Sequence, residues 1–93
     1  PAYFFFLMEQ MEKAAVALGL SRRVARRLVL ATAQGAAKLA AVSGEDPGLL
    51  RKRVTSKGGT TEAAFRVFQR GRLDKILKAG IEAAAQRAKE LAR

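Results

Sequence analysis

The sequence contains no cysteine, no histidine and no tryptophan, and only two prolines and one tyrosine. Without cysteine and histidine the chain has no disulfide, no thiolate nucleophile, no typical zinc site and no histidine for acid–base catalysis. Its acidic residues form no obvious acid/base couple, because Glu9 and Glu12 lie beside Lys13 in a pattern typical of a solvated ion cluster. The chain therefore carries no catalytic apparatus of its own.

Acidic residues are also scarce relative to basic ones. Lys and Arg total 18 against 8 for Asp and Glu, which gives a net charge of +10. Such a charge favours an anionic partner but does not distinguish nucleic acid, a membrane surface and a phosphorylated cofactor. Because 49% of the 93 residues are apolar, a chain this short has more apolar surface than it can bury alone. Part of that surface is expected to face a partner chain.

No segment shows the alternation of a β-strand, whereas apolar residues recur at helical spacing along most of the chain. Ser21 and Asp46 are good N-caps, and Gly19 and Gly71 are good helix ends. Thr60 or Thr61 is expected to cap a further helix. The sequence predicts one all-α domain over residues 1–93, with about five helices at 2–18, 22–42, 47–53, 61–70 and 72–91.

The N-terminal segment is aromatic from Tyr3 to Phe6 and apolar on all sides. A membrane anchor and a base-stacking platform are both conceivable, but the segment is too short to span a bilayer. Core or interface is the favoured interpretation, because aromatic side chains carry much of the apolar burial in both. We expect this end to be buried all round.

The most informative segment is Thr55-Ser-Lys-Gly-Gly-Thr-Thr61. Its glycines allow backbone N–H groups to approach a ligand, and the following helix N-terminus adds unpaired N–H groups and partial positive charge. Hydroxyl donors and the cation of Lys57 complete a set suited to a carboxylate or phosphate. The alternative is a flexible connector whose threonines merely cap the helix. The spacing does not match a Walker A loop.

Three basic clusters lie at 22–27, 51–53 and 70–78. They could form a nucleic-acid footprint, which makes a basic helical nucleic-acid-binding module one alternative function. A solvated surface is favoured instead, because the clusters lie on different elements and contain no recognition motif. We expect no nucleic-acid partner and no membrane.

Three stretches resemble pyrroline-5-carboxylate reductases. They follow in the family's order over almost the whole chain, and the loop Val54–Thr61, at a fixed distance from the other two, makes the resemblance specific. The first stretch is Pro1-Ala-Tyr-Phe-Phe5. The second is Ala15–Leu20 continuing into Ala25-Arg-Arg-Leu-Val29 and Gly35-Ala-Ala-Lys38. The third is Val54–Thr61, followed by Glu82-Ala-Ala-Ala85 and Glu90-Leu91.

The resemblance implies a helical dimerisation domain, like the C-terminal domain of 6-phosphogluconate dehydrogenase, that interlocks with a second chain. The family reduces 1-pyrroline-5-carboxylate to L-proline with NADPH or NADH in the cytoplasm, as the last step of proline biosynthesis. The implied partners are a second copy in a homodimer or higher oligomer, and a small carboxylate substrate or proline. A pure oligomerisation domain is the second alternative function.

The resemblance also implies which residues hold the substrate. Thr61 is the strongest single candidate for the carboxylate, and Val54 would line the ring pocket. The full carboxylate set is Ser56, Gly58, Gly59, Thr60 and Thr61. The cofactor would be bound by an N-terminal dinucleotide-binding domain, for which this sequence contains no Gly-x-Gly-x-x-Gly turn. We expect that domain of the parent enzyme to be missing here, and this part alone to be inactive.

Two positions depart from the family's pattern. Many relatives have proline where Lys57 stands, so this chain gains backbone freedom and a charge in the loop. Relatives also often have Gly-Gly-Phe where Gly71-Arg-Leu73 stands, a change expected to alter how the helix begins.

Overall fold

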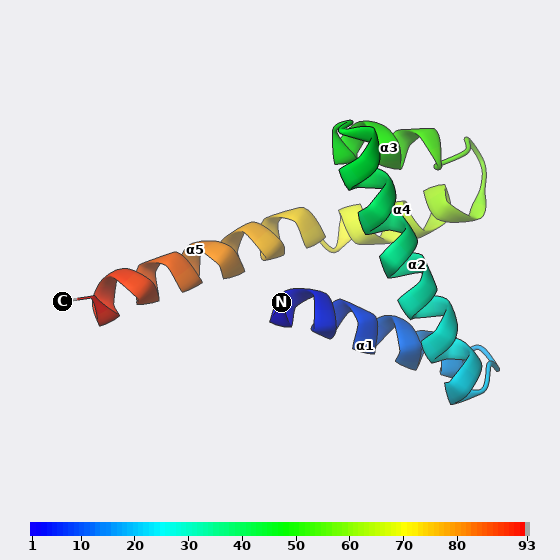
Figure 1. Ribbon diagram of the computed structural model, residues 1–93, viewed down its shortest axis with the longest axis horizontal. Helices are drawn as coiled ribbons and strands as arrows, with labels where there is room; N and C mark the ends of the chain where they lie inside the picture. The colour runs from blue at the N-terminus through cyan, green and yellow to red at the C-terminus, as the bar shows by residue number, and fades with distance from the viewer. Residues whose placement is uncertain (93) are drawn as a thin grey trace. The chain divides into compact units, whose positions relative to one another are not determined.

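The computed structural model describes residues 1–92 as five α-helices joined by short connections, with no strand in that range (Figure 1). The helices are α1 (Ala2–Ala17), α2 (Arg22–Ser43), α3 (Pro47–Arg53), α4 (Thr60–Arg70) and α5 (Leu73–Leu91). The prediction of an all-α chain with about five helices is confirmed.

The chain divides into two compact units, Pro1–Leu50 and Arg51–Arg93. Within the first unit α1 packs against α2, and within the second α4 packs against α5. The boundary between the units falls inside α3.

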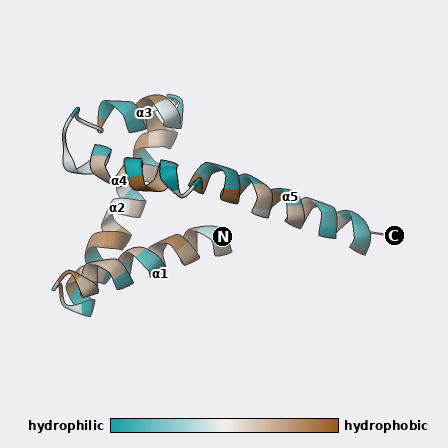
Figure 2. Ribbon diagram, turned by 180° about the vertical axis from the view of Figure 1, so that it is seen from behind, coloured by the Kyte–Doolittle hydropathy of each residue, from teal (hydrophilic) through white to brown (hydrophobic). Residues whose placement is uncertain are grey.

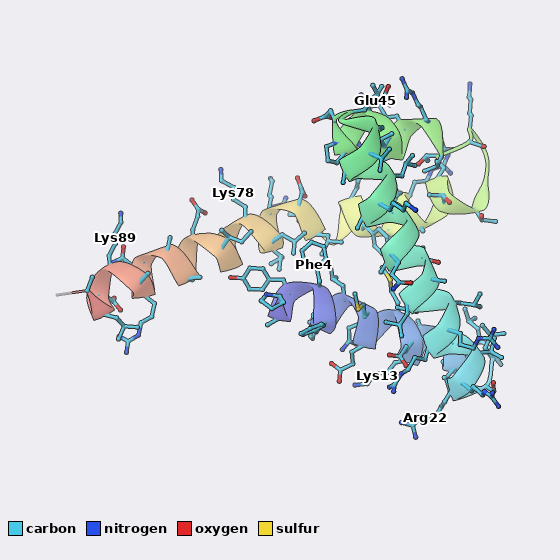
Figure 3. All side chains as sticks on the ribbon, viewed as in Figure 1. Phe4, Lys13, Arg22, Glu45, Lys78 and Lys89 are labelled. Atoms are coloured by element: carbon cyan, nitrogen blue, oxygen red, sulfur yellow. The ribbon has the colours of Figure 1, made fainter. Side chains whose placement is uncertain are left out.

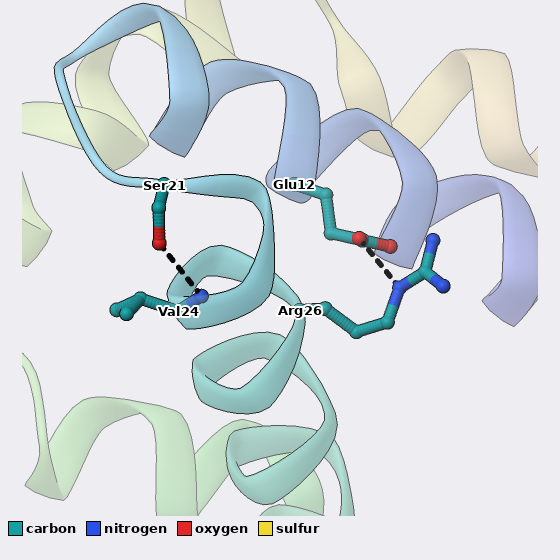
Figure 4. A network of polar contacts seen from close by, with 4 residues as sticks. All are labelled: Glu12, Ser21, Val24 and Arg26. Carbon is teal, nitrogen blue, oxygen red and sulfur yellow. Dashed lines mark hydrogen bonds and ion pairs between the residues drawn. The ribbon is translucent and has the colours of Figure 1, made fainter.

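The connection between α1 and α2 follows from local sequence. Gly19 adopts φ +111, a conformation that residues with a Cβ rarely adopt, and its N–H donates to the Val16 carbonyl at 3.0 Å. The Leu20 N–H donates to the Ala15 carbonyl at 3.2 Å and completes the turn. Ser21 is then the N-cap of α2, and its Oγ accepts from the Val24 N–H at 3.2 Å (Figure 4). Both predicted signals are confirmed.

The start of α3 also follows the prediction. Asp46 Oδ2 accepts from the Leu49 N–H at 3.2 Å, as an N-cap side chain does. Pro47 occupies the first helical position, where its missing N–H leaves no helical bond unmade. The helix ends at Arg53, as the sequence predicts.

The predicted cap of α4 is wrong. The N-cap is Gly59, with φ −86 and ψ −179, and Thr60 and Thr61 already belong to the helix. No side-chain hydroxyl accepts a capping bond at this helix start. Because an N-cap residue needs an extended backbone, the two threonines in helical conformation cannot fill that position.

Burial within the chain is slight. Among residues 1–92 only Ala25, on α2, is fully buried, and apolar segments appear in brown on both α1 and α2 (Figure 2). The prediction that the aromatic end is buried all round is wrong for this chain by itself, since Phe4 is 69% exposed and Phe5 64%. The aromatic side chains project from α1, where Phe4 is labelled in Figure 3, and α2 does not cover them.

The last helix is amphipathic. Lys78 and Lys89 extend from the same side of α5 (Figure 3), as expected for residues eleven positions, about three turns, apart. Leu77 and Ile81 form an apolar stripe that remains 44% and 54% exposed. Among residues 1–92, none of the helices combines the length and apolar character that crossing a bilayer requires.

Candidate functional site

The loop between α3 and α4 begins with a bond that ends α3. The Thr55 hydroxyl donates to the Arg51 carbonyl at 2.6 Å, and the Thr55 N–H donates to the Lys52 carbonyl at 3.2 Å. Both bonds satisfy carbonyls that the helix end would leave unpaired. Thr55 therefore has a structural role, which separates it from the hydroxyl residues that follow.

A tight turn then brings Ser56 next to Gly59. The Gly59 N–H donates to the Ser56 carbonyl at 3.0 Å, and a Cβ on Gly59 would lie only 3.1 Å from that carbonyl oxygen. Gly58 has φ +76, in the left-handed region. The turn therefore favours glycine at both positions: a Cβ on residue 59 would crowd the Ser56 carbonyl, and residue 58 has a left-handed backbone.

Some N–H groups of this loop have a hydrogen-bond acceptor within the chain, and others, called open here, do not. The Gly58 N–H donates to Glu62 Oε1 at 2.9 Å, and the Gly59 N–H is used inside the turn. Thr60 and Thr61 stand at the first two positions of α4, where N–H groups have no partner within the helix. Among the described residues no acceptor is recorded for either of them.

The structure thus places the predicted site residues in one short loop, Val54–Thr61, which precedes and begins α4. The side chains of Ser56, Thr60 and Thr61 are exposed, and Val54 is 67% exposed. The threonine hydroxyls take no part in capping the helix. Two open N–H groups, nearby hydroxyls and the positive end of α4 are what a carboxylate needs. Gly58 and Gly59 shape the turn, while their N–H groups are engaged elsewhere.

Three charged residues lie in the turn or in the first two turns of α4: Lys57, Glu62 and Arg66. Lys57 is exposed on the loop. Arg66 Nη2 lies 3.1 Å from Glu62 Oε1, and the two residues form an i, i+4 ion pair on α4. The net charge of these three residues favours an anion.

The bond from Gly58 to Glu62 was not predicted. The available signal was the spacing Gly59-Thr-Thr-Glu62, because an acidic residue three positions after an N-cap commonly reaches back to the start of its helix. In this chain the carboxylate reaches one residue further, to the Gly58 N–H.

A second feature of the same unit lies along α4 and the start of α5. The Arg51 guanidinium stacks 5.4 Å from the Phe65 ring centroid, and Phe65 meets Phe68 edge-on at 5.5 Å. These side chains border an open hollow of about 550 Å³ that also includes Arg72 and Leu77. None of the predicted carboxylate-binding residues lines this hollow.

The arginine cluster on α2 forms a separate feature of the first unit. Arg26 Nε lies 2.9 Å from Glu12 Oε1, so α1 and α2 are linked by an ion pair (Figure 4). The cluster, together with Glu12 and Leu30, borders an open hollow of about 620 Å³. Its arginines are Arg22, Arg23, Arg26 and Arg27. Among residues 1–92, no group of acidic side chains is arranged to hold a metal ion.

Comparison with known proteins gives a consistent result. The family described as "Pyrroline-5-carboxylate reductase dimerisation" matches residues 1–91. The chain is 51% identical over 92 residues to a pyrroline-5-carboxylate reductase from Pseudomonas aeruginosa. The matched segment covers 99% of this chain and 34% of that protein.

Two solved structures have the same fold as this chain. One is a pyrroline-5-carboxylate reductase from Coxiella burnetii, with a TM-score of 0.92 and 43% identity, matching 98% of this chain and 34% of its own. The other is a pyrroline carboxylate reductase from Plasmodium falciparum with NADP bound, with a TM-score of 0.95 and 27% identity. This match covers 100% of the present chain and 36% of the Plasmodium chain. The chain spans about a third of the length of the relatives it matches.

Proposed function

Because the chain belongs to the pyrroline-5-carboxylate reductase dimerisation family, we propose that it is the helical half of such a reductase. The enzyme would reduce 1-pyrroline-5-carboxylate to L-proline with NADPH or NADH, in the last step of proline biosynthesis and in the cytoplasm. Residues 1–93 act in this proposal as one dimerisation and substrate-binding domain.

One observation carries the binding part of the proposal. Thr60 and Thr61 do not cap α4, so neither hydroxyl is committed to holding the helix start. This counts against the alternative in which the threonines are only helix caps. Their open N–H groups and hydroxyls, with Ser56, form the proposed carboxylate site, and Thr61 is its principal residue. Val54 lines the ring pocket.

The chemistry assigned to this chain is binding and orientation. Reduction of the substrate's C=N bond needs a hydride on carbon and a proton on nitrogen, with the substrate held in a fixed orientation. The nicotinamide cofactor would supply the hydride. The residues of this chain do not fit that cofactor, since the sequence has no Gly-x-Gly-x-x-Gly turn and the described helices form no dinucleotide-binding fold. We therefore assign the cofactor to a dinucleotide-binding domain outside these residues.

The exposed apolar surface supports the proposed assembly. Tyr3, Phe6 and Leu18 are 56%, 58% and 88% exposed, on helices of a chain that is 49% apolar. Exposed aromatic and leucine side chains on this scale are typical of subunit interfaces. The proposed partner is a second copy whose helices interlock with these, in a homodimer or higher oligomer.

The test replaces the matching third of the Pseudomonas aeruginosa reductase with this chain. We expect the chimera to form proline from 1-pyrroline-5-carboxylate and a reduced nicotinamide cofactor, and to be at least dimeric by light scattering. The 93-residue chain alone is the matched control and should show no turnover, because it lacks a cofactor site.

Three results would contradict the proposal. If the chimera is folded and dimeric but inactive, this chain is only an oligomerisation domain and does not bind substrate. If the chimera is monomeric, the proposed association with a second copy is wrong. Turnover by the isolated chain would disprove the assignment of the cofactor to another domain.

A further inference from the structure

The Glu62 carboxylate connects the candidate loop to the body of α4. Its Oε1 accepts from the Gly58 N–H at 2.9 Å and from Arg66 Nη2 at 3.1 Å. The Glu62 side chain is only 31% exposed, whereas that of Arg66 is 69% exposed. A single carboxylate oxygen thus joins the loop backbone to a side chain one turn further along the helix.

The hydrogen bond from the Gly58 N–H to Glu62 holds the loop at Gly58, whose backbone is in the left-handed region. Gly58, at φ +76, has no Cβ to restrict it, so its conformation must be stabilised by what its backbone contacts. The turn bond from Gly59 to Ser56 holds one side, and Glu62 holds the other. Fixing the turn in advance lowers the ordering entropy that a bound ligand must overcome.

The hydrogen bond of Glu62 favours ligand binding, whereas its negative charge opposes the binding of an anionic ligand. The carboxylate stands at the N-terminus of the helix whose first N–H groups form the proposed site, so it repels a second carboxylate there. Arg66 contacts the same oxygen and offsets that negative charge. The Glu62 carboxylate can therefore stabilise the loop, and the loop can still bind a second carboxylate as its ligand.

We propose that Glu62 is a positioning residue for substrate binding, with Arg66 as its neutralising partner. This inference rests on the proposed carboxylate site at Ser56–Thr61 and deepens it. Glu62 shapes the site through Gly58 without touching the substrate, and Arg66 is needed only while residue 62 carries a negative charge.

The experiment measures the dissociation constant of L-proline for the 93-residue chain, from the backbone amide signals of Gly58, Thr60 and Thr61 in NMR titrations. Glu62→Ala removes the bond, and we expect binding to weaken roughly fivefold as the loop loses order. Glu62→Gln keeps an oxygen that can accept from Gly58 and should stay within about twofold of wild type.

Arg66→Met keeps most of the apolar stem but leaves the Glu62 charge uncompensated, and should weaken binding roughly threefold. Combining it with Glu62→Gln removes the repulsion and should restore binding to within about twofold of wild type. A purely structural role of the pair would give no such rescue. Glu90→Ala is the matched control, because it breaks an ion pair with Arg87 on α5 and should leave binding unchanged.

The outcomes separate this inference from the proposed function. If Thr61→Ala weakens binding but Glu62→Ala stays within twofold or binds more tightly, the positioning role is overturned and the site survives. Failure of the double variant to recover overturns the role of Arg66 as neutralising partner. If wild-type chain does not bind L-proline, or if Thr61→Ala binds as wild type does, the proposed site falls and this inference with it.

Discussion

The starts of α2 and α4 use the same residue types in different ways. At α2 the Ser21 hydroxyl accepts from the Val24 N–H, so its acceptor capacity serves the helix. At α4 a glycine takes the N-cap position, and the two threonines lie inside the first turn without capping it. A hydroxyl at a helix start is therefore a structural group in one place and an available donor in the other. The backbone conformation of the N-cap residue decides which it is.

The charges at the two helix starts differ in the same way. Four arginines crowd the first turns of α2, where cations oppose the helix dipole. Among these four, Arg26 alone forms an ion pair with a residue of the described range 1–92. At α4 the first turn carries Glu62, which suits the dipole and fastens the loop. The start of α4 is built around a fixed turn, whereas the start of α2 is a simple capped helix with an exposed basic surface.

The largest expected effect is at Thr61. In the chimeric reductase, Thr61→Ala should weaken substrate binding by about 1.5–3 kcal/mol, because a hydroxyl that bonds a carboxylate is lost. The Michaelis constant measures this effect, and thermal unfolding should change little because the hydroxyl caps nothing. Thr61→Ser, which keeps the hydroxyl, is the control. Unchanged kinetics in Thr61→Ala would exclude Thr61 from the site.

The next largest effect is expected at Ser21, where substitution should change stability and leave substrate binding unchanged. Ser21→Ala should lower the free energy of unfolding by about 1 kcal/mol, because the Val24 N–H loses its acceptor. Thermal or denaturant unfolding at matched protein concentration measures the loss, and the Michaelis constant should not change. A kinetic effect without a stability effect would show that the two helix starts do not differ as described.

The smallest effect extends the comparison to α5. Arg72, the N-cap of α5, has φ +55, which disfavours any residue with a Cβ. Arg72→Gly relieves that strain but gives the unfolded chain more freedom, so we expect a net stabilisation of only about 0.5 kcal/mol. Lys78→Gly, at an exposed position in the interior of α5, is the opposite control and should destabilise by about 1 kcal/mol. If both variants destabilise equally, backbone strain at Arg72 is not significant.

The fold was predictable because its signals are local. Ser21, Asp46 and Gly19 each act within a few residues of their own position, and the structure confirms all three. The i, i+4 pair of Glu62 and Arg66 was predictable for the same reason. The grouping of the candidate site residues in one loop was also readable, because they are neighbours in the sequence.

Residue spacing and local caps thus specify the five helices, the helix ends at Gly19, Ser21 and Asp46, and the segment that carries the candidate site. Which N–H donors of that segment stay without an acceptor became clear only from the folded chain. The helix pattern could not distinguish a capping threonine from one inside the first turn, because both fit the same spacing. That choice depends on the turn at Gly58 and Gly59 and on the reach of Glu62 across it. The exposure of the aromatic end was likewise decided by packing, since α2 leaves Phe4 and Phe5 uncovered.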